Sequence, residues 1–322
     1  MTDLIGHLAG FGRRPALIDD GTSVSYRELA DLVGDAVDRL GRRRRLVSVP
    51  MRHEISTVAG YLGALAGWLV VLAMPHDRSG DAIIDTYQPD AVIESGGAVT
   101  ECRDPGGHEL HDDLALLMST SGSTGSPKLV RLSRGNLISN AESIATYLEI
   151  SERDRAATVL PMSYCYGLSV VHTHLLRGAS LLLTGRSVMD ASLWELFAAE
   201  GCTSFAGVPY TFDMLDKMNF EQMHLPRLRY VTQAGGRLAP QRVRGYAELG
   251  RRQGWEFFVM YGATEATARM AYLPPRAAAE HPASIGRPIP GGSFTVEPVD
   301  EWSEPGVGEL VYHGPNVMMG YA

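Results

Sequence analysis

The sequence predicts an α/β protein with two doubly wound, mostly parallel sheets flanked by helices, plus a small β-rich subdomain that forms part of a barrel. Helical patterns alternate with short apolar runs over most of the 322 residues, and this alternation is typical of parallel sheets with crossover helices. From about Ser284 the pattern changes to proline, glycine and strand-like pieces such as Ser293–Val299 and Glu309–Tyr312. A chain of this length with 45% hydrophobic residues is expected to form two or three packed lobes.

The first clear helix is predicted over Ser25–Leu40, because its apolar residues fall on one helical face. These residues are Leu29, Leu32, Val33, Ala36, Val37 and Leu40. The basic run Arg42–Arg45 follows this helix and precedes the apolar stretch Leu46–Val49. We interpret the basic run as a solvated helix end rather than a binding patch.

The apolar segment Thr57–Pro75 approaches the length needed to cross a membrane. Glycines interrupt it, and no positively charged flank anchors it. We therefore predict a buried helix, a turn near Gly67 and a buried strand over Trp68–Met74, since fully buried strands consist of continuous apolar runs.

Further strands are predicted where apolar runs separate helical segments. These runs are Ala115–Met118, Ala156–Leu160, Ser180–Thr184, Thr203–Val208, Arg229–Gln233 and Glu256–Met260. We divide the chain into a first α/β subdomain over residues 1–180 and a second over residues 181–283. Residues 284–322 are expected to begin the small β subdomain.

The charge and the cysteines restrict the partners and the compartment. The formal net charge is −8, which argues against nucleic acid as the main partner, because phosphate backbones are bound by basic surfaces. Cys102, Cys165 and Cys202 are too few and too widely spaced for a disulfide framework or a metal site. Residues 1–12 do not resemble a signal peptide. We therefore expect a cytoplasmic protein without a membrane span.

A phosphate-binding loop is predicted over Met118–Lys128, which reads MSTSGSTGSPK and follows an apolar strand. Glycines let backbone N–H groups turn toward an anion, hydroxyl groups donate further hydrogen bonds, and Lys128 supplies a positive charge. The other lysine of the chain is Lys217, so a lysine here indicates a need for a compact charge. The spacing differs from the Walker pattern. A flexible Ser/Gly linker is the alternative, but a linker would not begin at a buried strand and end at a rare lysine.

The loop resembles the phosphate loop of the adenylate-forming superfamily, which comprises acyl- and aryl-CoA ligases, peptide-synthetase adenylation domains and luciferases. Five other segments resemble motifs of this family, occur in the family order and span nearly all of the chain. These segments are Arg14–Leu29, Tyr230–Leu238, Phe258–Glu265, Ser284–Gly291 and Gly308–Tyr321.

The resemblance implies a set of nucleotide-binding residues. The β- and γ-phosphates of ATP would be held by Thr120, Ser121, Gly122, Ser123, Thr124, Gly125 and Lys128. Adenine and AMP would contact Gly235, Gly236, Arg237, Tyr261, Gly262 and Thr264. The Tyr261 ring would lie against adenine, Thr264 would contact the α-phosphate, and Glu265 would bind Mg²⁺, which prefers oxygen ligands shared with phosphates. Thr264, Glu265 and Lys128 are the candidate catalytic residues. Without the neighbouring motifs, a core tyrosine and a helix cap would be the simpler interpretations of Tyr261 and of the Thr264–Glu265 pair.

The pocket for the acid is expected to involve Tyr164, Gly207, Val208, Tyr210 and Gly235. Tyr164 stands where many acyl-CoA ligases have a histidine, and it is either an aromatic gate or a structural tyrosine. The aspartate with which amino-acid-activating members pair the substrate ammonium is absent, which favours an acid without an α-amine. His172 and His174, like the cluster His108–Asp113, lack further ligands at a credible spacing, so zinc is not predicted.

The resemblance implies ATP-dependent activation of a carboxylic acid to an acyl-adenylate, with release of pyrophosphate. In intact relatives the thiol of coenzyme A, or of the phosphopantetheine of an acyl carrier protein, then takes the acyl group. The sequence ends inside the last motif, before the ribose-binding aspartate, the hinge and the C-terminal domain with the adenylation lysine. We therefore expect the large N-terminal part of a ligase, weak or inactive alone. The alternative is a catalytically inactive homologue that binds nucleotide or a carrier protein. A dinucleotide-dependent oxidoreductase is excluded because no G-x-G-x-x-G opens the first βαβ unit.

Overall fold

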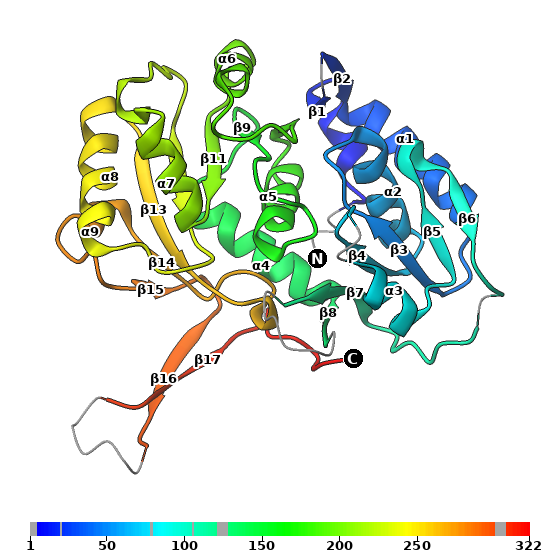
Figure 1. Cartoon of the computed structure of the whole chain (residues 1–322). Helices are drawn as coiled ribbons and strands as arrows, with labels where there is room; N and C mark the ends of the chain where they lie inside the picture. The colour runs from blue at the N-terminus through cyan, green and yellow to red at the C-terminus, as the bar shows by residue number, and fades with distance from the viewer. Residues whose placement is uncertain (1–4, 20, 78–79, 105, 121–127, 300–306) are drawn as a thin grey trace.

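Two large sheets and one hairpin organise the protein (Figure 1). The computed structural model describes residues 5–19, 21–77, 80–104, 106–120, 128–299 and 307–322. The nine-stranded sheet contains β1 (Pro15–Asp19), β2 (Thr22–Ser25), β9 (Arg155–Ala157), β10 (Ser180–Leu183), β11 (Ser204–Gly207), β12 (Tyr230–Gln233), β13 (Glu256–Tyr261), β14 (Ala271–Leu273) and β15 (Arg287–Pro288). The six-stranded sheet contains β3 (Leu46–Pro50), β4 (Val70–Met74), β5 (Ala91–Ile93), β6 (Val99–Glu101), β7 (Leu114–Ser119) and β8 (Leu129–Ser133).

Both sheets are parallel in the middle and antiparallel at their edges. The larger runs in the order β15-β14-β13-β12-β11-β9-β10-β1-β2 and the smaller in the order β6-β5-β3-β4-β7-β8. Strands β1, β9, β10, β11, β12 and β13 pair in parallel. The register places Gly207, Gln233 and Val259 side by side, so the carboxyl ends of β11, β12 and β13 meet at one edge. The predicted fold class is confirmed.

Helices fill three layers around these sheets. They are α1 (Tyr26–Leu40), α2 (Ile55–Ala66), α3 (Asp81–Tyr87), α4 (Arg134–Tyr147), α5 (Cys165–Leu176), α6 (Ala191–Ala199), α7 (Pro209–Lys217), α8 (Pro240–Gln253) and α9 (Pro275–Ala278). Helices α1, α2, α4 and α5 contribute to the core between the two sheets. Helices α6, α7 and α8 pack on the outer face of the nine-stranded sheet, and α3 packs on the outer face of the six-stranded sheet.

The helix predicted at Ser25–Leu40 is α1, and Ser25 is its N-cap. The Ser25 hydroxyl accepts from the Glu28 N–H at 3.3 Å, and the Glu28 carboxylate accepts from the Ser25 N–H at 2.7 Å. This reciprocal capping satisfies two N–H groups that the first helical turn leaves open. The apolar face of α1 is buried against α2 and the first sheet strand.

The apolar segment Thr57–Pro75 forms most of α2, a turn and β4, and the helix and strand are largely buried. Every residue of β4 is buried. Trp68 belongs to the turn and not to the strand: its φ is 61° and its side chain is 58% exposed, with the ring 4.1 Å from the Arg134 guanidinium. Among the described residues, no helix is long and apolar enough to cross a membrane.

The interpretation of Arg42–Arg45 as a solvated helix end is wrong for its second half. Arg45 is 5% exposed and pairs with Glu101 at 2.5 Å, while its other terminal nitrogen donates to the Leu40 carbonyl. Arg44 donates to the carbonyl oxygens of Trp68 and Leu114. These two side chains are less exposed than expected because they lie where α1 joins β3. There they donate to carbonyl groups of neighbouring segments, and Arg45 pairs with a carboxylate on the edge strand β6.

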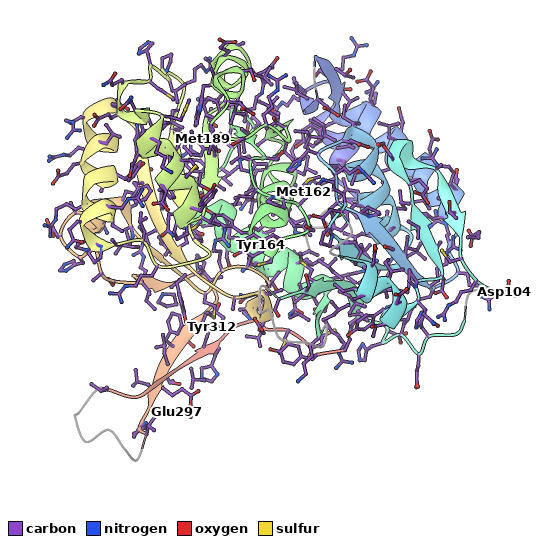
Figure 2. The ribbon with its side chains drawn as sticks, in the orientation of Figure 1. Asp104, Met162, Tyr164, Met189, Glu297 and Tyr312 are labelled. Atoms are coloured by element: carbon purple, nitrogen blue, oxygen red, sulfur yellow. The ribbon has the colours of Figure 1, made fainter. Side chains whose placement is uncertain are left out.

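The nine-stranded sheet contains strands from both sides of the division at residue 180 that the sequence suggested. Strands β1, β2 and β9 precede this point but lie in the nine-stranded sheet with the strands of residues 181–283. The 284–322 region contains a hairpin of β16 (Ser293–Glu297) and β17 (Glu309–His313), which are antiparallel. Figure 1 shows this hairpin projecting from the body, and Figure 2 places Tyr312 near its base and Glu297 farther out.

Candidate active site

A cavity of about 750 Å³ opens beyond the carboxyl ends of β12 and β13, the edge at which doubly wound sheets bind ligands. The start of α5 forms its opposite wall, and Figure 2 shows Tyr164, the residue before α5, in the middle of the molecule. The predicted site residues that line this cavity are Thr120, Tyr164, Gly235, Gly236, Arg237, Tyr261, Gly262, Thr264 and Glu265. Residues that follow strands of both large sheets therefore border the same cavity.

The turn after β12 requires glycine at position 235. Gly235 has a φ of 76°, and a Cβ there would lie 2.7 Å from the Tyr164 hydroxyl and 3.0 Å from Val208 Cγ1. Gln233 holds the turn because its side-chain amide donates to the Gly236 carbonyl at 2.7 Å. The turn leaves the backbone of Gly235 and Gly236 exposed to the cavity.

The turn after β13 presents Tyr261 and buries Thr264. The Met270 N–H donates to the Tyr261 carbonyl, and a Cβ on Gly262 would overlap the carbonyl oxygen of Ala268. The Tyr261 ring remains 42% exposed beside the cavity. An exposed ring at a cavity wall is available for stacking with a planar ligand.

Thr264 and Glu265 form the short 3-10 turn η5 (Thr264–Ala266). The Thr264 hydroxyl donates to the Cys165 sulfur at 3.4 Å. Burial raises the pKa of the Cys165 thiol, and the hydrogen bond from Thr264 opposes this rise. Glu265 is half-buried and accepts a 2.7 Å hydrogen bond from the Tyr321 hydroxyl on Oε1, a bond that raises the pKa of the Tyr321 phenol.

Residues 318–322, here called the strap, connect this turn to β8. The Met318 N–H donates to the Glu265 carbonyl, while Met319, Gly320 and Ala322 exchange backbone hydrogen bonds with Leu129 and Arg131 of β8. Lys128, the residue before β8, is exposed and its Nζ lies 6.0 Å from the centre of the Tyr321 ring. The exit of the predicted phosphate loop and the Glu265 carboxylate are thus tied to the same short segment.

Residues 82–322 match the family model described as "AMP-binding enzyme". This chain belongs to the AMP-binding enzyme family. It is 28% identical over 257 residues to the oxalate–CoA ligase of Arabidopsis thaliana, a match that covers 78% of this chain and 48% of the relative. It is 34% identical over 238 residues to the indoleacetate–CoA ligase of Aromatoleum aromaticum, covering 72% of this chain and 45% of the relative.

The chain spans about half the length of these curated relatives. Its fold is similar to that of o-succinylbenzoate CoA synthetase (MenE) from Bacillus subtilis in complex with the acyl-adenylate intermediate OSB-AMP. The TM-score is 0.83 at 22% identity, and the match covers 100% of this chain and 71% of the other. The resemblance to adenylate-forming enzymes is therefore confirmed at the level of family and fold.

Several predicted site residues lie outside the cavity lining or outside the described residues. Ser121, Gly122, Ser123, Thr124 and Gly125 belong to the undescribed segment 121–127. Lys128 stands at its end, near the strap. Gly207 is buried at the end of β11, and the Val208 side chain lies beside the Gly235 turn. Tyr210 lies on α7 with 68% of its side chain exposed, so its predicted place in the acid pocket has no support from the cavity lining.

The lining or supporting residues that the sequence analysis did not assign to the site include Gln233, Cys165, Tyr321 and Arg269. Cys165 follows Tyr164 directly and Gln233 lies two residues before Gly235, so a wider window around each predicted position would have included them. Arg269 is 2% exposed and borders the cavity. An arginine four residues after Glu265 carries no signal of burial by itself, because arginine is ordinarily exposed.

The histidine pair is part of the protein interior. His172 Nε2 lies 2.7 Å from the Tyr61 hydroxyl, and His174 lies 2.8 Å from the Val170 carbonyl and 3.2 Å from the Tyr230 hydroxyl. Burial lowers the pKa of each to about 4. Among the described residues, no group of three or more His, Cys, Asp or Glu side chains is arranged to hold a metal ion. The three cysteines are free thiols.

Proposed function

We propose that this chain binds Mg·ATP and a carboxylic acid, and that the intact protein joins them into an acyl-adenylate with release of pyrophosphate. The main observation in support is that Thr120, Tyr164, Gly235, Tyr261 and Glu265 border one cavity although they come from separate segments of the chain. Family membership supports the reaction class. The roles of the individual residues in binding and reaction are likewise proposed.

The nucleotide would lie between the two glycine turns. The exposed Tyr261 ring would stack on adenine, and the uncovered backbone at Gly235 and Gly236 allows close approach of the AMP part. Thr120, with Lys128 at the other end of segment 121–127, would direct hydrogen bonds and charge to the β- and γ-phosphates. Arg237, exposed at the cavity rim, would add positive charge beside the AMP part.

Glu265 fits the magnesium ligand that the family implies. One carboxylate oxygen accepts from Tyr321, and the other makes no hydrogen bond to a described residue. Mg²⁺ bound together with ATP phosphates needs only one or two protein carboxylates, so the lack of a larger acidic cluster is no obstacle. When bound, the cation would neutralise charge on the phosphates.

In the reaction an oxygen of the substrate carboxylate attacks the α-phosphorus. A new O–P bond forms, the bond to the bridging oxygen breaks, and pyrophosphate leaves with the electron pair. No protein nucleophile is required, so the protein contributes positioning and charge stabilisation. Thr264 would donate to a non-bridging oxygen of the α-phosphate, and Tyr164 would close the acid side of the cavity.

In the intact protein the acyl group would then pass to the thiol of coenzyme A or of the phosphopantetheine of an acyl carrier protein. Both acceptors present the same thiol to the acyl-adenylate. A reducing cytoplasm is the compartment that we propose, because the cysteines are all free thiols.

The nucleotide part of the proposal is tested by calorimetric titration of the chain with Mg·ATP. We expect saturable binding in the wild type and at least tenfold weaker Mg²⁺-dependent binding in Glu265→Gln, because the metal ligand loses its charge. Glu256→Gln is the matched control, since Glu256 is an exposed carboxylate at the amino end of β13, the strand that leads to the Glu265 turn. Equal weakening in both variants, or no binding by the wild type, would refute the proposal.

The catalytic part is tested by pyrophosphate exchange with a panel of carboxylic acids, using the protein that contains this chain at its natural length. Exchange that depends on a particular acid supports adenylate formation. Nucleotide binding without exchange for any acid would instead favour a catalytically inactive nucleotide- or carrier-protein-binding homologue.

A further inference from the structure

Arg269 is a buried guanidinium that has no carboxylate partner among the described residues. It follows η5 on the chain and its side chain is 2% exposed. Its contacts are all neutral: Nη1 donates to the Ala268 carbonyl at 3.0 Å, Nε lies 3.4 Å from the Met260 sulfur, and Cζ lies 3.8 Å from the centre of the Tyr166 ring. A cation in this position is incompletely compensated.

The other deeply placed arginines show what is missing. Arg45, the second fully buried arginine among the described residues, pairs with Glu101 at 2.5 Å. Arg103 and Arg155, which are partly buried, pair with Asp90 and Glu200 at 2.8 and 2.9 Å. Of the two fully buried arginines among the described residues, Arg45 thus has a carboxylate partner and Arg269 has none.

The missing carboxylate partner of Arg269 is informative because a buried, unpaired charge is unfavourable. A guanidinium cannot lose its proton inside a protein, and a buried charge without a counter-ion lowers stability unless something else compensates it. Stacking on Tyr166 and one carbonyl bond supply part of the compensation. An anion delivered by a ligand would supply the rest, and in bidentate geometry it would be held firmly.

The location of Arg269 points to the ligand that would deliver the anion. Arg269 lines the 750 Å³ cavity together with Tyr164 and Cys165, on the side where α5 faces β13. It also lines a small cavity of about 20 Å³, whose wall includes the hydroxyl residues Ser169 and Thr232. That volume holds about one water molecule, so Arg269 borders both this small, mostly apolar space and the 750 Å³ cavity.

We propose that Arg269 binds a second carboxylate of the substrate, so that the acid activated at this site is a dicarboxylic acid. One carboxylate reacts at the α-phosphorus near Thr264, and the other forms an ion pair with Arg269. This inference rests on the proposed function and adds the substrate class to it. Tyr166 and Met260 hold the guanidinium in place from α5 and β13, so the distance between the two anion-binding points selects the length of the acid.

The first experiment measures acid binding without requiring turnover. The chain is saturated with Mg²⁺ and α,β-methylene-ATP, and straight-chain dicarboxylic acids with three to six carbon atoms are titrated calorimetrically. Each is compared with the monocarboxylic acid of equal carbon number. We expect at least one diacid to bind tenfold or more tightly than its monoacid. Equal or weaker binding of every diacid would overturn the inference.

Two variants connect the preference to this residue. Arg269→Met keeps an apolar contact with Tyr166 but removes the charge, and it should abolish the diacid preference while leaving monoacid and nucleotide binding within about twofold. Arg269→Lys keeps the positive charge but loses the paired N–H donors of the guanidinium, and it should retain an intermediate preference for the diacid. An undiminished diacid preference in Arg269→Met would overturn the inference.

A melting measurement separates recognition from a structural role. Because the charge is uncompensated, Arg269→Met should melt at the same or a higher temperature than the wild type. Dicarboxylic acid should raise the melting temperature of the nucleotide-saturated wild type more than that of nucleotide-saturated Arg269→Met. A marked loss of melting temperature in both variants, with unchanged acid selectivity in Arg269→Lys, would assign Arg269 to the core instead. Failure of the nucleotide analogue to bind would refute the proposed function, whereas nucleotide binding without diacid selectivity would refute only this inference.

Discussion

The two ends of the parallel strands in the nine-stranded sheet are built differently. At the amino ends, Asp154 accepts hydrogen bonds from Arg229 at 2.8 Å, from the Thr203 hydroxyl at 3.0 Å and from the Ser151 N–H at 2.8 Å. Burial raises the pKa of the Asp154 carboxyl, but these hydrogen bonds outweigh it and hold the pKa below its ordinary value. At the carboxyl ends, Tyr261 is exposed, and Glu265 accepts one side-chain hydrogen bond.

The difference separates groups that stabilise the fold from groups that are available to a ligand. Polar groups at the amino ends are satisfied by one another, so their interactions contribute to folding. Polar groups at the carboxyl ends keep unused hydrogen-bonding capacity, so their interactions are completed by what binds. We expect changes at the two ends to affect different measurements.

The largest effect is expected from Asp154→Asn. The change leaves the Arg229 guanidinium without its charge partner and weakens the contacts with Thr203 and Ser151. We expect the free energy of unfolding to fall by about 3 kcal/mol, measured by urea denaturation, with unchanged Mg·ATP affinity in the folded protein. Asp104→Asn, at an exposed site labelled in Figure 2, serves as the control and should change stability by less than about 0.5 kcal/mol. Equal stabilities of the two variants would remove the distinction between the ends.

The next effect is a pH dependence of stability that comes from the interior. Burial lowers the pKa of His172 and His174 to about 4, so between pH 6.5 and 4 the unfolded chain binds protons that the folded chain does not. Stability is therefore fully present above pH 6.5 and falls as the pH is lowered, by up to about 1.4 kcal/mol per pH unit for each histidine. Below about pH 4 the contribution of Asp154 is lost as well.

His174→Gln should remove one of the two histidine contributions to this slope, because glutamine does not titrate. His281→Gln, at an exposed position, should leave the slope unchanged. Urea unfolding at pH 7, 6 and 5 measures both. If His174→Gln leaves the pH dependence of stability unchanged, groups other than His174 cause the loss of stability in acid.

A smaller effect is expected at the carboxyl ends from Tyr261→Ala. The ring is exposed, so folding stability should change by less than about 1 kcal/mol, while AMP affinity should fall roughly fivefold through the loss of about 1 kcal/mol of stacking. Tyr210→Ala is the matched control, since Tyr210 is an exposed tyrosine outside the cavity lining. Calorimetric titration with AMP separates the two, and a loss of affinity in Tyr210→Ala would return that residue to the site.

The smallest effect is expected from Tyr321→Phe, which removes the hydrogen bond to Glu265 and keeps the ring. One exposed hydrogen bond contributes about 1 kcal/mol or less. We expect the Mg²⁺ concentration for half-maximal ATP binding to rise by two- to fivefold, while AMP binding without Mg²⁺ stays the same. An equal change in both titrations would mean that Tyr321 supports the strap and not the carboxylate.

Local patterns were sufficient to predict much of this protein. The alternation of helices and apolar strands predicted the parallel sheets. The stretch Phe258–Glu265 was identified by its resemblance to a family motif, which its residues carry because they are consecutive in the sequence. Arg45 and Arg269 could not be predicted, because their burial depends on partners distant in sequence, Glu101 and Tyr166 respectively. Tyr210 was placed in the acid pocket together with Gly207 and Val208; it lies in the first turn of α7 and is 68% exposed, and its role stays a prediction.

The strap has a consequence for solubility. Strand β8 is the outermost strand of the six-stranded sheet, and such an edge exposes N–H and C=O groups that can pair with another molecule. Met319, Gly320 and Ala322 occupy those groups at Leu129 and Arg131. A protein in which these residues were detached from β8 would present an open strand edge, and we expect it to self-associate and aggregate through that edge.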